Sequence, residues 1–291
     1  MRKPLVLIGC GKAGISLALA LKTAGWTIAS CLSRTEESTR QGQQWLACAA
    51  LPSLSVIPPD AAVILGVPEG QLVELDRRLA QADPHIKGRV ILHLSGALPA
   101  RVLESCRLRG ASVGSFHAVM TLPDPLTGAR RLRSCTFALE GRPAAVELMR
   151  DMAQSLSGKF FILSPRGKTL YHAAAVLAAN HVVVLLADSQ ELLLRAGADP
   201  AAATPAFQTL VAGTVESVYA AGPVAAITGP VERGDTATVR NHLHALKRWP
   251  SLRERYRVMA LGALDLAKRR HPERLEAYDD LAKLLSGWQS S

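Results

Sequence analysis

The stretch LVLIGCGKAGISLALALKTAG, residues 5–25, decides how the first half of this chain folds. Its first four residues predict a short buried strand, and the run rich in Ala and Leu that follows predicts a helix. The turn between them is a G-x-G-x-x-G motif made of Gly9, Cys10, Gly11, Lys12, Ala13 and Gly14. Gly9 permits a tight turn, Gly11 lets the backbone approach a pyrophosphate, and Gly14 lets the helix pack close to the strand. The motif therefore predicts a dinucleotide-binding turn; a plain strand–helix turn is the alternative.

The alternation of apolar strands and amphipathic helices continues to about residue 165. Further strands are predicted at 27–32, 61–67, 89–94, 113–117, 136–139 and 160–163, with helices at 14–24, 71–81, 99–109 and 143–156. Short apolar strands separated by helices are typical of a mostly parallel sheet covered on both faces. The fold class is therefore α/β, with a Rossmann-type domain over residues 1–164.

Only helices are predicted after Ser164-Pro165, at 168–196, 201–221, 236–247, 252–270 and 273–285. Residues 165–291 should thus form an all-α domain for substrate binding and dimerisation. The first of these helices is apolar almost all round, so it needs more cover than a small domain gives. We expect a homodimer formed through this helical domain.

The composition indicates which kinds of ligand and which cellular compartment suit the chain. The chain has 291 residues and a formal charge of +10, but aromatic residues make up only 4% and none interleaves with a basic stripe. This favours an anionic small molecule over nucleic acid. The five cysteines are scattered and form no Cys-x-x-Cys pair, which argues against a disulfide framework or a metal site and for the cytoplasm. The apolar run 173–187 is too short to span a membrane.

The end of the second strand indicates which cofactor is bound. Ser33, Arg34 and Thr35 stand where an NAD site usually carries a carboxylate. A carboxylate would repel a 2′-phosphate, whereas a guanidinium and two hydroxyls would hold it. The expected cofactor is therefore NADP(H), with Val67 and Pro68 lining the same crevice after the next strand; a surface arginine is the alternative for Arg34.

These motifs resemble the superfamily of β-hydroxyacid dehydrogenases and ketopantoate and pyrroline-carboxylate reductases. The similarity is closest to one subgroup, in which a helical C-terminal domain of unknown function follows the Rossmann-like domain. It is carried by HLSG (93–96), SFH (115–117), YHAAA (171–175) with Asn180, and TGPVERGD (228–235). The resemblance implies an NADP-dependent oxidoreductase and makes ketopantoate reduction one candidate reaction.

The resemblance also implies catalytic residues. In ketopantoate reductase and its relatives a lysine on the long interdomain helix donates the proton, and an asparagine follows one or two turns later. The matching helix here carries Lys168, His172 and Asn180, so either Lys168 or His172 is the donor. His172 and Asn180 are eight residues apart, about 80° around a continuous helix, so both could face one cleft.

Ser95 and His117 follow two predicted strands on the crevice side, and Arg233 lies in a loop that Asp235 should end by capping the next helix. Ser95, His117 and Arg233 could each bind a substrate carboxylate or carbonyl. Alternatively, Ser95 and His117 cap their loops, and Arg233 forms a surface salt bridge. The sequence thus predicts an NADPH-dependent reductase of a small carbonyl compound with a carboxylate, such as a 2-oxo acid. The alternatives are an imine reductase and a non-catalytic NADP-binding sensor or scaffold.

Overall fold

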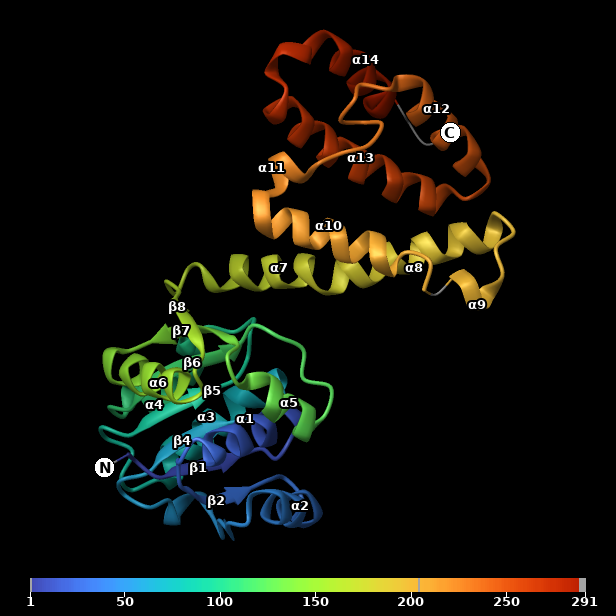
Figure 1. Cartoon of the computed structure of the whole chain (residues 1–291). Coiled ribbons are helices and arrows are strands. Elements are labelled where there is room, and N and C mark those ends of the chain that lie inside the picture. The colour runs from blue at the N-terminus through green and yellow to red at the C-terminus, as the bar shows by residue number, and fades with distance from the viewer. Residues whose placement is uncertain (1, 204, 288–291) are drawn as a thin grey trace. The chain divides into compact units, whose positions relative to one another are not determined.

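The computed structural model describes residues 2–203 and 205–287, and the chain divides into two compact units, residues 1–180 and 181–291 (Figure 1). Each unit is described by itself. The sequence places the domain boundary at 164/165, whereas by contacts the helix that begins at Lys168 groups with the first unit.

The first unit is built on one eight-stranded sheet in the order β3-β2-β1-β4-β5-β6-β7-β8. The strands are β1 Leu5–Ile8, β2 Ile28–Leu32, β3 Ala49–Ala50, β4 Ala62–Leu65, β5 Val90–His93, β6 Ser112–Ala118, β7 Thr136–Gly141 and β8 Lys159–Ile162. All neighbours pair in parallel except β6 and β7, which are antiparallel. From β1 the chain first runs to β2 on one side and then to β4 on the other. Such a switch point opens a crevice at the carboxyl ends of β1 and β4, where this fold binds ligands.

Helices cover both faces of the sheet (Figure 1). They are α1 Lys12–Thr23, α2 Glu36–Leu46, α3 Glu69–Ala82, α4 Glu104–Leu108, α5 Pro125–Leu132 and α6 Pro143–Ser155. The next helix, α7 Lys168–Ala178, follows β8, and its one buried residue is Lys168. One apolar core lies between the sheet and α1, α2, α5 and α6; the other lies between the opposite face and α3 and α4. Burial on both faces explains why the central strands are continuously apolar rather than alternating.

The expected α/β class is confirmed, and the expected strands lie within a few residues of the observed ones. Two helices, α2 and α5, and the short strand β3 were not predicted. The expected single helix 168–196 is wrong, because it is interrupted. Ala179, at φ −121° and ψ −67°, separates α7 from α8 (Asn180–Arg195).

The second unit is helical. Besides α8 it contains α9 Pro200–Ala203, α10 Gln208–Ala221, α11 Pro223–Ala226, α12 Thr236–Ala245, α13 Pro250–Arg270 and α14 Leu275–Ser286. Its apolar core comes from α12, α13 and α14, with Tyr278 fully buried at the centre. Among the described residues, α8 and α10 contribute none to this core, and each leaves apolar side chains exposed.

Candidate functional site

In the glycine-rich turn after β1, two glycines, Gly9 and Gly14, are packed too tightly for any other residue. Gly9 has φ +99°, and a Cβ built on it would lie 2.7 Å from the backbone of Gly66 after β4. A Cβ on Gly14 would lie 2.5 Å from the carbonyl oxygen of Gly9. The turn, the start of α1 and the end of β4 are thus in backbone contact, as the motif predicted.

The start of α1 offers a place for an anion. Its N-cap, Gly11, has no side chain to occupy the free N–H groups, and the first turn holds no acidic residue. A Cβ on Gly11 would meet Gly66 alone, at 3.5 Å, so the space beside the turn is open. Lys12 is exposed and Ala13 half-buried at this helix start. Free N–H groups and the positive end of the helix dipole fit a phosphate.

The three residues after β2 have different surroundings. Thr35 is the N-cap of α2, and its hydroxyl accepts a hydrogen bond from the Ser38 N–H at 3.2 Å. The Ser33 N–H donates to Thr39 Oγ1 at 2.9 Å, which leaves the Ser33 hydroxyl uncommitted by that bond. Arg34 is exposed. Its guanidinium is therefore accessible to an anion, while Thr35 also has a structural task that the sequence pattern did not reveal.

Val67 and Pro68 lead out of β4 past the glycine turn. A Cβ on Gly9 would lie 2.7 Å from Val67 Cγ1, so this valine packs directly on the turn. Pro68, at φ −56° and ψ 146°, is the N-cap of α3. Both residues therefore lie at the carboxyl end of β4, where the sequence predicted them.

Lys168 is the first residue of α7 and one of the most buried polar residues of the chain, with 1% of its surface exposed. Its Nζ donates a hydrogen bond of 2.6 Å to Ser115 Oγ on β6, and Ser115 donates in turn to the Ser95 carbonyl at 3.1 Å. Burial lowers the pKa of Lys168 to about 8, although the carboxylates of Glu69 and Glu140 act to raise it. An ammonium that gives up its proton this near neutrality is a competent general acid.

His117 and Tyr171 lie beside this lysine. The Nδ1 atom of His117 is hydrogen-bonded to the Tyr171 hydroxyl at 2.5 Å, and the Lys168 ammonium lies 5.5 Å from the centre of the Tyr171 ring. Burial, with the charges of Lys168 and His172, lowers the pKa of His117 to about 4. Burial also raises the pKa of Tyr171 to about 12. At neutral pH both side chains are uncharged hydrogen-bonding groups, and the lysine is the charged member.

His172 and Asn180 differ in their surroundings. His172 is half-buried on α7, and its Nδ1 is a buried atom for which the described residues provide no hydrogen-bond partner. Asn180 is exposed and begins the next helix. Because the helix breaks at Ala179, the angular relation expected between the two residues does not hold. The structure thus brings Lys168 and His172 to one place but gives no support for Asn180 beside them.

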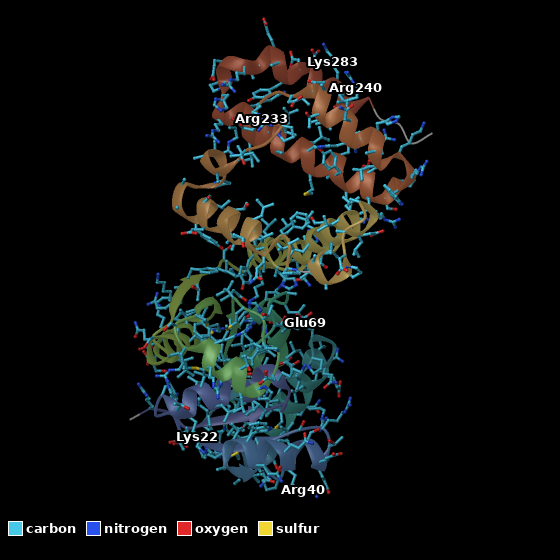
Figure 2. The ribbon with its side chains drawn as sticks, turned by 45° about the vertical axis from the view of Figure 1, so that its right-hand side comes forward. Lys22, Arg40, Glu69, Arg233, Arg240 and Lys283 are labelled. Atoms are coloured by element: carbon cyan, nitrogen blue, oxygen red, sulfur yellow. The ribbon has the colours of Figure 1, made fainter. Side chains whose placement is uncertain are left out.

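Ser95 lies at the carboxyl end of β5, where its hydroxyl organises the loop. It accepts from the N–H groups of Ala97 and Leu98, at 3.1 and 2.9 Å, and donates to the Glu69 carboxylate. Glu69, labelled in Figure 2, projects from the start of α3. These bonds match the loop-capping alternative for Ser95. Glu69 itself was missed, although its position directly after Pro68 put it at a strand end.

A small pocket connects the two ends of the site. Its lining includes Ala13 from the start of α1, and Phe116 and His117 from β6. The polar group around Lys168 and the glycine turn are therefore parts of one sheet edge, the edge formed by the carboxyl ends of β1, β4, β5 and β6.

Arg233 belongs to the second unit, where it is exposed (Figure 2). In the same loop Asp235 is the N-cap of α12 and accepts from the Thr238 N–H at 3.0 Å, which confirms the predicted cap. Gly234 supplies the positive φ of +76° that this loop requires.

Comparisons with known proteins agree with this architecture. A family model for a Rossmann-like domain matches residues 1–118, and a model for a domain of unknown function, DUF2520, matches residues 135–263. No curated protein matches the chain. Among solved structures, a protein from Bacteroides fragilis, described as a candidate NADP oxidoreductase, is 23% identical with a TM-score of 0.70, over 91% of this chain and 98% of its own.

Two further structures share the fold over nearly the full length. A protein from Thermotoga maritima is 21% identical with a TM-score of 0.73, over 92% of this chain and 99% of its own. An imine reductase from Myxococcus stipitatus in complex with NADP+ is 16% identical with a TM-score of 0.63, over 94% of each chain. The first part of the chain is thus similar to a Rossmann-like domain, and residues 135–263 are similar to the DUF2520 domain.

Proposed function

We propose that this chain is an NADPH-dependent oxidoreductase that reduces a small carbonyl compound carrying a carboxylate, such as a 2-oxo acid. The observation that carries the proposal is the buried ammonium of Lys168, held by Ser115 on the same sheet edge as the glycine turn. Burying a charged lysine costs free energy, so such a residue is a strong candidate for a functional role.

The cofactor proposal rests on the turn and on Arg34. The open N-terminus of α1 fits the pyrophosphate, and the exposed Arg34 guanidinium fits the 2′-phosphate, with Ser33 and Thr35 beside it. The imine reductase of Myxococcus stipitatus, which shares the fold, is in complex with NADP+. NADP(H) is therefore the cofactor that we expect this site to hold.

The proposed chemistry needs a hydride and a proton. NADPH, when bound, supplies the hydride, and the developing negative charge on the carbonyl oxygen must then be neutralised. Lys168 holds a proton at Nζ that it can transfer to that oxygen, and Ser115 Oγ fixes the direction of the ammonium. His117 and Tyr171 are the neutral groups placed to orient the substrate. His172 remains the alternative donor.

Imine reduction is the second candidate, because a structure of this fold is an imine reductase. A protonated imine already carries the positive charge that a carbonyl must acquire from an acid. An imine reductase would therefore depend less on Lys168 and His172 than a carbonyl reductase does.

The test is a panel of 2-oxo acids and cyclic imines followed by NADPH absorbance, with thermal-shift titrations of NADPH and NADH in parallel. We expect stabilisation by NADPH and turnover with at least one 2-oxo acid. Turnover with imines alone would show that the substrates are imines and not 2-oxo acids. Stabilisation without any turnover would favour the sensor or scaffold, and no response to either coenzyme would overturn the proposal.

We also propose that the helical unit forms a homodimer. Val183 on α8 and Leu210 and Tyr219 on α10 are 67%, 64% and 88% exposed, and exposed apolar surface on this scale marks an interface. The stretch Lys168–Arg195 is also long and apolar enough to cross a membrane, by length and composition alone. Asp188, paired with Arg255 of α13 at 2.5 Å, makes it a poor membrane segment, so a second copy is the occupant we propose.

The oligomer is tested by light scattering after gel filtration without detergent. We expect twice the chain mass of 31.0 kDa. A monodisperse monomer would overturn the dimer, and cosedimentation with lipid vesicles would favour the membrane. With its five free cysteines, the chain fits a reducing compartment, and we propose the cytoplasm.

A further inference from the structure

Three thiols that are far apart in the sequence meet at one end of the sheet. Cys10 follows β1 within the glycine turn, Cys31 lies in β2, and Cys48 precedes β3. Because β3, β2 and β1 are neighbours in this order, the three residues come close together; Cys10 and Cys31 lie at the carboxyl ends of β1 and β2, and Cys48 lies at the start of β3. None of them takes part in the proposed reduction.

The sulfurs of Cys10 and Cys31 both lie against Gly42 of α2. A Cβ built on Gly42 of α2 would lie 2.5 Å from Sγ of Cys10 and 3.1 Å from Sγ of Cys31, so the two sulfurs can be no farther apart than the sum of these distances. Cys10 Sγ donates to the Leu32 carbonyl at 3.9 Å. Cys31 Sγ also donates to the Thr39 carbonyl at 3.7 Å. The missing side chain of Gly42 is what leaves room for this pair.

The two partners are not equivalent. Cys10 is partly exposed, whereas Cys31 has no exposed surface. The neighbouring Cys31 thiol lowers the pKa of Cys10, while the Cys10 thiol raises the pKa of Cys31 to about 12. Cys10 is therefore the thiol that an oxidant attacks, and Cys31 is the thiol in position to resolve the product.

We propose that Cys10 and Cys31 form a reversible disulfide when a hydroperoxide reaches the chain, and that this disulfide switches off cofactor binding at the glycine turn. The effect on binding rests on the proposed function; formation of the bond does not. The Cys10 thiolate attacks a peroxide oxygen, which breaks the O–O bond and gives a sulfenic acid and water after protonation. Cys31 then attacks that sulfur and releases a second water. The two thiols lose two electrons, and the peroxide gains them.

The location of Cys10 is what links the disulfide to the cofactor. A disulfide requires its sulfurs to approach to about 2.05 Å, so the Cys10 side chain must move toward β2. Cys10 stands between Gly9 and Gly11, and the turn is in backbone contact with Gly14 and Gly66. The backbone is fixed at Gly9 and Gly14, whereas the space at Gly11 is open, so we expect the movement of Cys10 to shift the Gly11 backbone and the N–H groups that face the pyrophosphate.

Cys48 is the competing partner. The neighbouring Cys31 thiol and burial raise the Cys48 pKa, and the nearby charge of Lys22 (Figure 2) opposes this only in part. A thiol whose pKa is raised carries little thiolate and reacts slowly with peroxide. Oxidation should therefore start at Cys10.

The experiment treats the full chain with hydrogen peroxide, maps disulfides by peptide mass spectrometry, and measures NADPH affinity by calorimetry before oxidation, after it, and after dithiothreitol. We expect a Cys10–Cys31 crosslink, an affinity loss of about ten- to a hundredfold, and recovery on reduction. Cys31→Ala should bind NADPH but keep its affinity under peroxide. Cys135→Ser, a change at another partly buried cysteine, should behave as the unmodified chain does.

Each other outcome has a distinct meaning. A crosslink between Cys31 and Cys48, or none in the folded chain, overturns the inference. A Cys10–Cys31 crosslink that leaves NADPH affinity unchanged also overturns the switch. If the reduced chain binds neither coenzyme while the crosslink still forms, the proposed function is wrong, but the proposed Cys10–Cys31 disulfide is correct. If Cys31→Ala does not fold, crosslinking in Cys48→Ala, which leaves the proposed pair intact, decides between the two partners.

Discussion

Replacing Lys168 by Met separates catalysis from stability at this site. Methionine keeps an unbranched apolar side chain in the buried space but removes the ammonium that donates to Ser115 Oγ. If Lys168 supplies the proton, turnover should fall by about 10²–10⁴. The affinity for NADPH should not change, because the glycine turn and Arg34 are untouched.

The same substitution should not destabilise the chain. The pKa of Lys168 falls from 10.5 to about 8, and a shift of this size corresponds to about 3 kcal/mol by which burial penalises the charged form. The unfolded chain thus binds the proton more tightly, and the free energy of unfolding rises with pH between about 8 and 10.5. Met removes this penalty and loses about 1.5–3 kcal/mol with the bond from the ammonium to Ser115, so stability at neutral pH should stay about equal.

The assay combines steady-state rates on the best substrate of the panel, calorimetry with NADPH, and urea unfolding. Lys159→Met, at an exposed lysine on β8, is the matched control and should change none of the three. Full turnover in Lys168→Met would refute the assignment of this lysine as the acid. Loss of turnover together with several kcal/mol of stability would show that the residue is structural.

Four further results are expected. Arg34→Ala should weaken NADPH binding about ten- to a hundredfold with little effect on NADH, by calorimetry; an equal effect on both would refute the 2′-phosphate contact. His172→Ala should leave most of the turnover if Lys168 is the donor, and a loss of about 10²–10⁴ would exchange their roles. Turnover should decline as pH rises through about 8, where Lys168 loses its proton; a rate that stays constant up to pH 10 would exclude Lys168 as the proton donor. Val183→Glu should shift the light-scattering mass toward the monomer, and an unchanged dimer would place the interface elsewhere.

The sheet could be predicted because its strands are buried on both faces and therefore read as apolar runs bounded by turns. The helix α2 was missed for the opposite reason. Its sequence, EESTRQGQQWL, is mostly polar and carries Gly42, so it lacks an apolar period. The helix α2 is stabilised by the Thr35 cap and by the packing of Gly42 against the cysteines. Neither feature can be recognised from a local sequence pattern.

The glycine turn was predictable because its requirements are local: three glycines, a strand before them and a helix after. The choice between Lys168 and His172 was not, because it depends on contacts between distant residues. Ser115, which fixes the lysine, lies 53 positions earlier in the chain, and burial by the sheet edge is what lowers the lysine pKa. The break at Ala179 likewise follows from no Pro or Gly and could not be read from the sequence.

The cysteines show how topology changes the meaning of a sequence pattern. Cys10, Cys31 and Cys48 are far apart in the sequence, and no short motif contains any two of them. In a parallel sheet, however, each crossover returns the chain to the same edge, so residues about one crossover apart come together at the strand ends. Cys10, Cys31 and Cys48 stand at that spacing, and β1, β2 and β3 are adjacent. The crossovers from β1 to β2 and from β2 to β3 therefore bring these three cysteines close to the glycine turn.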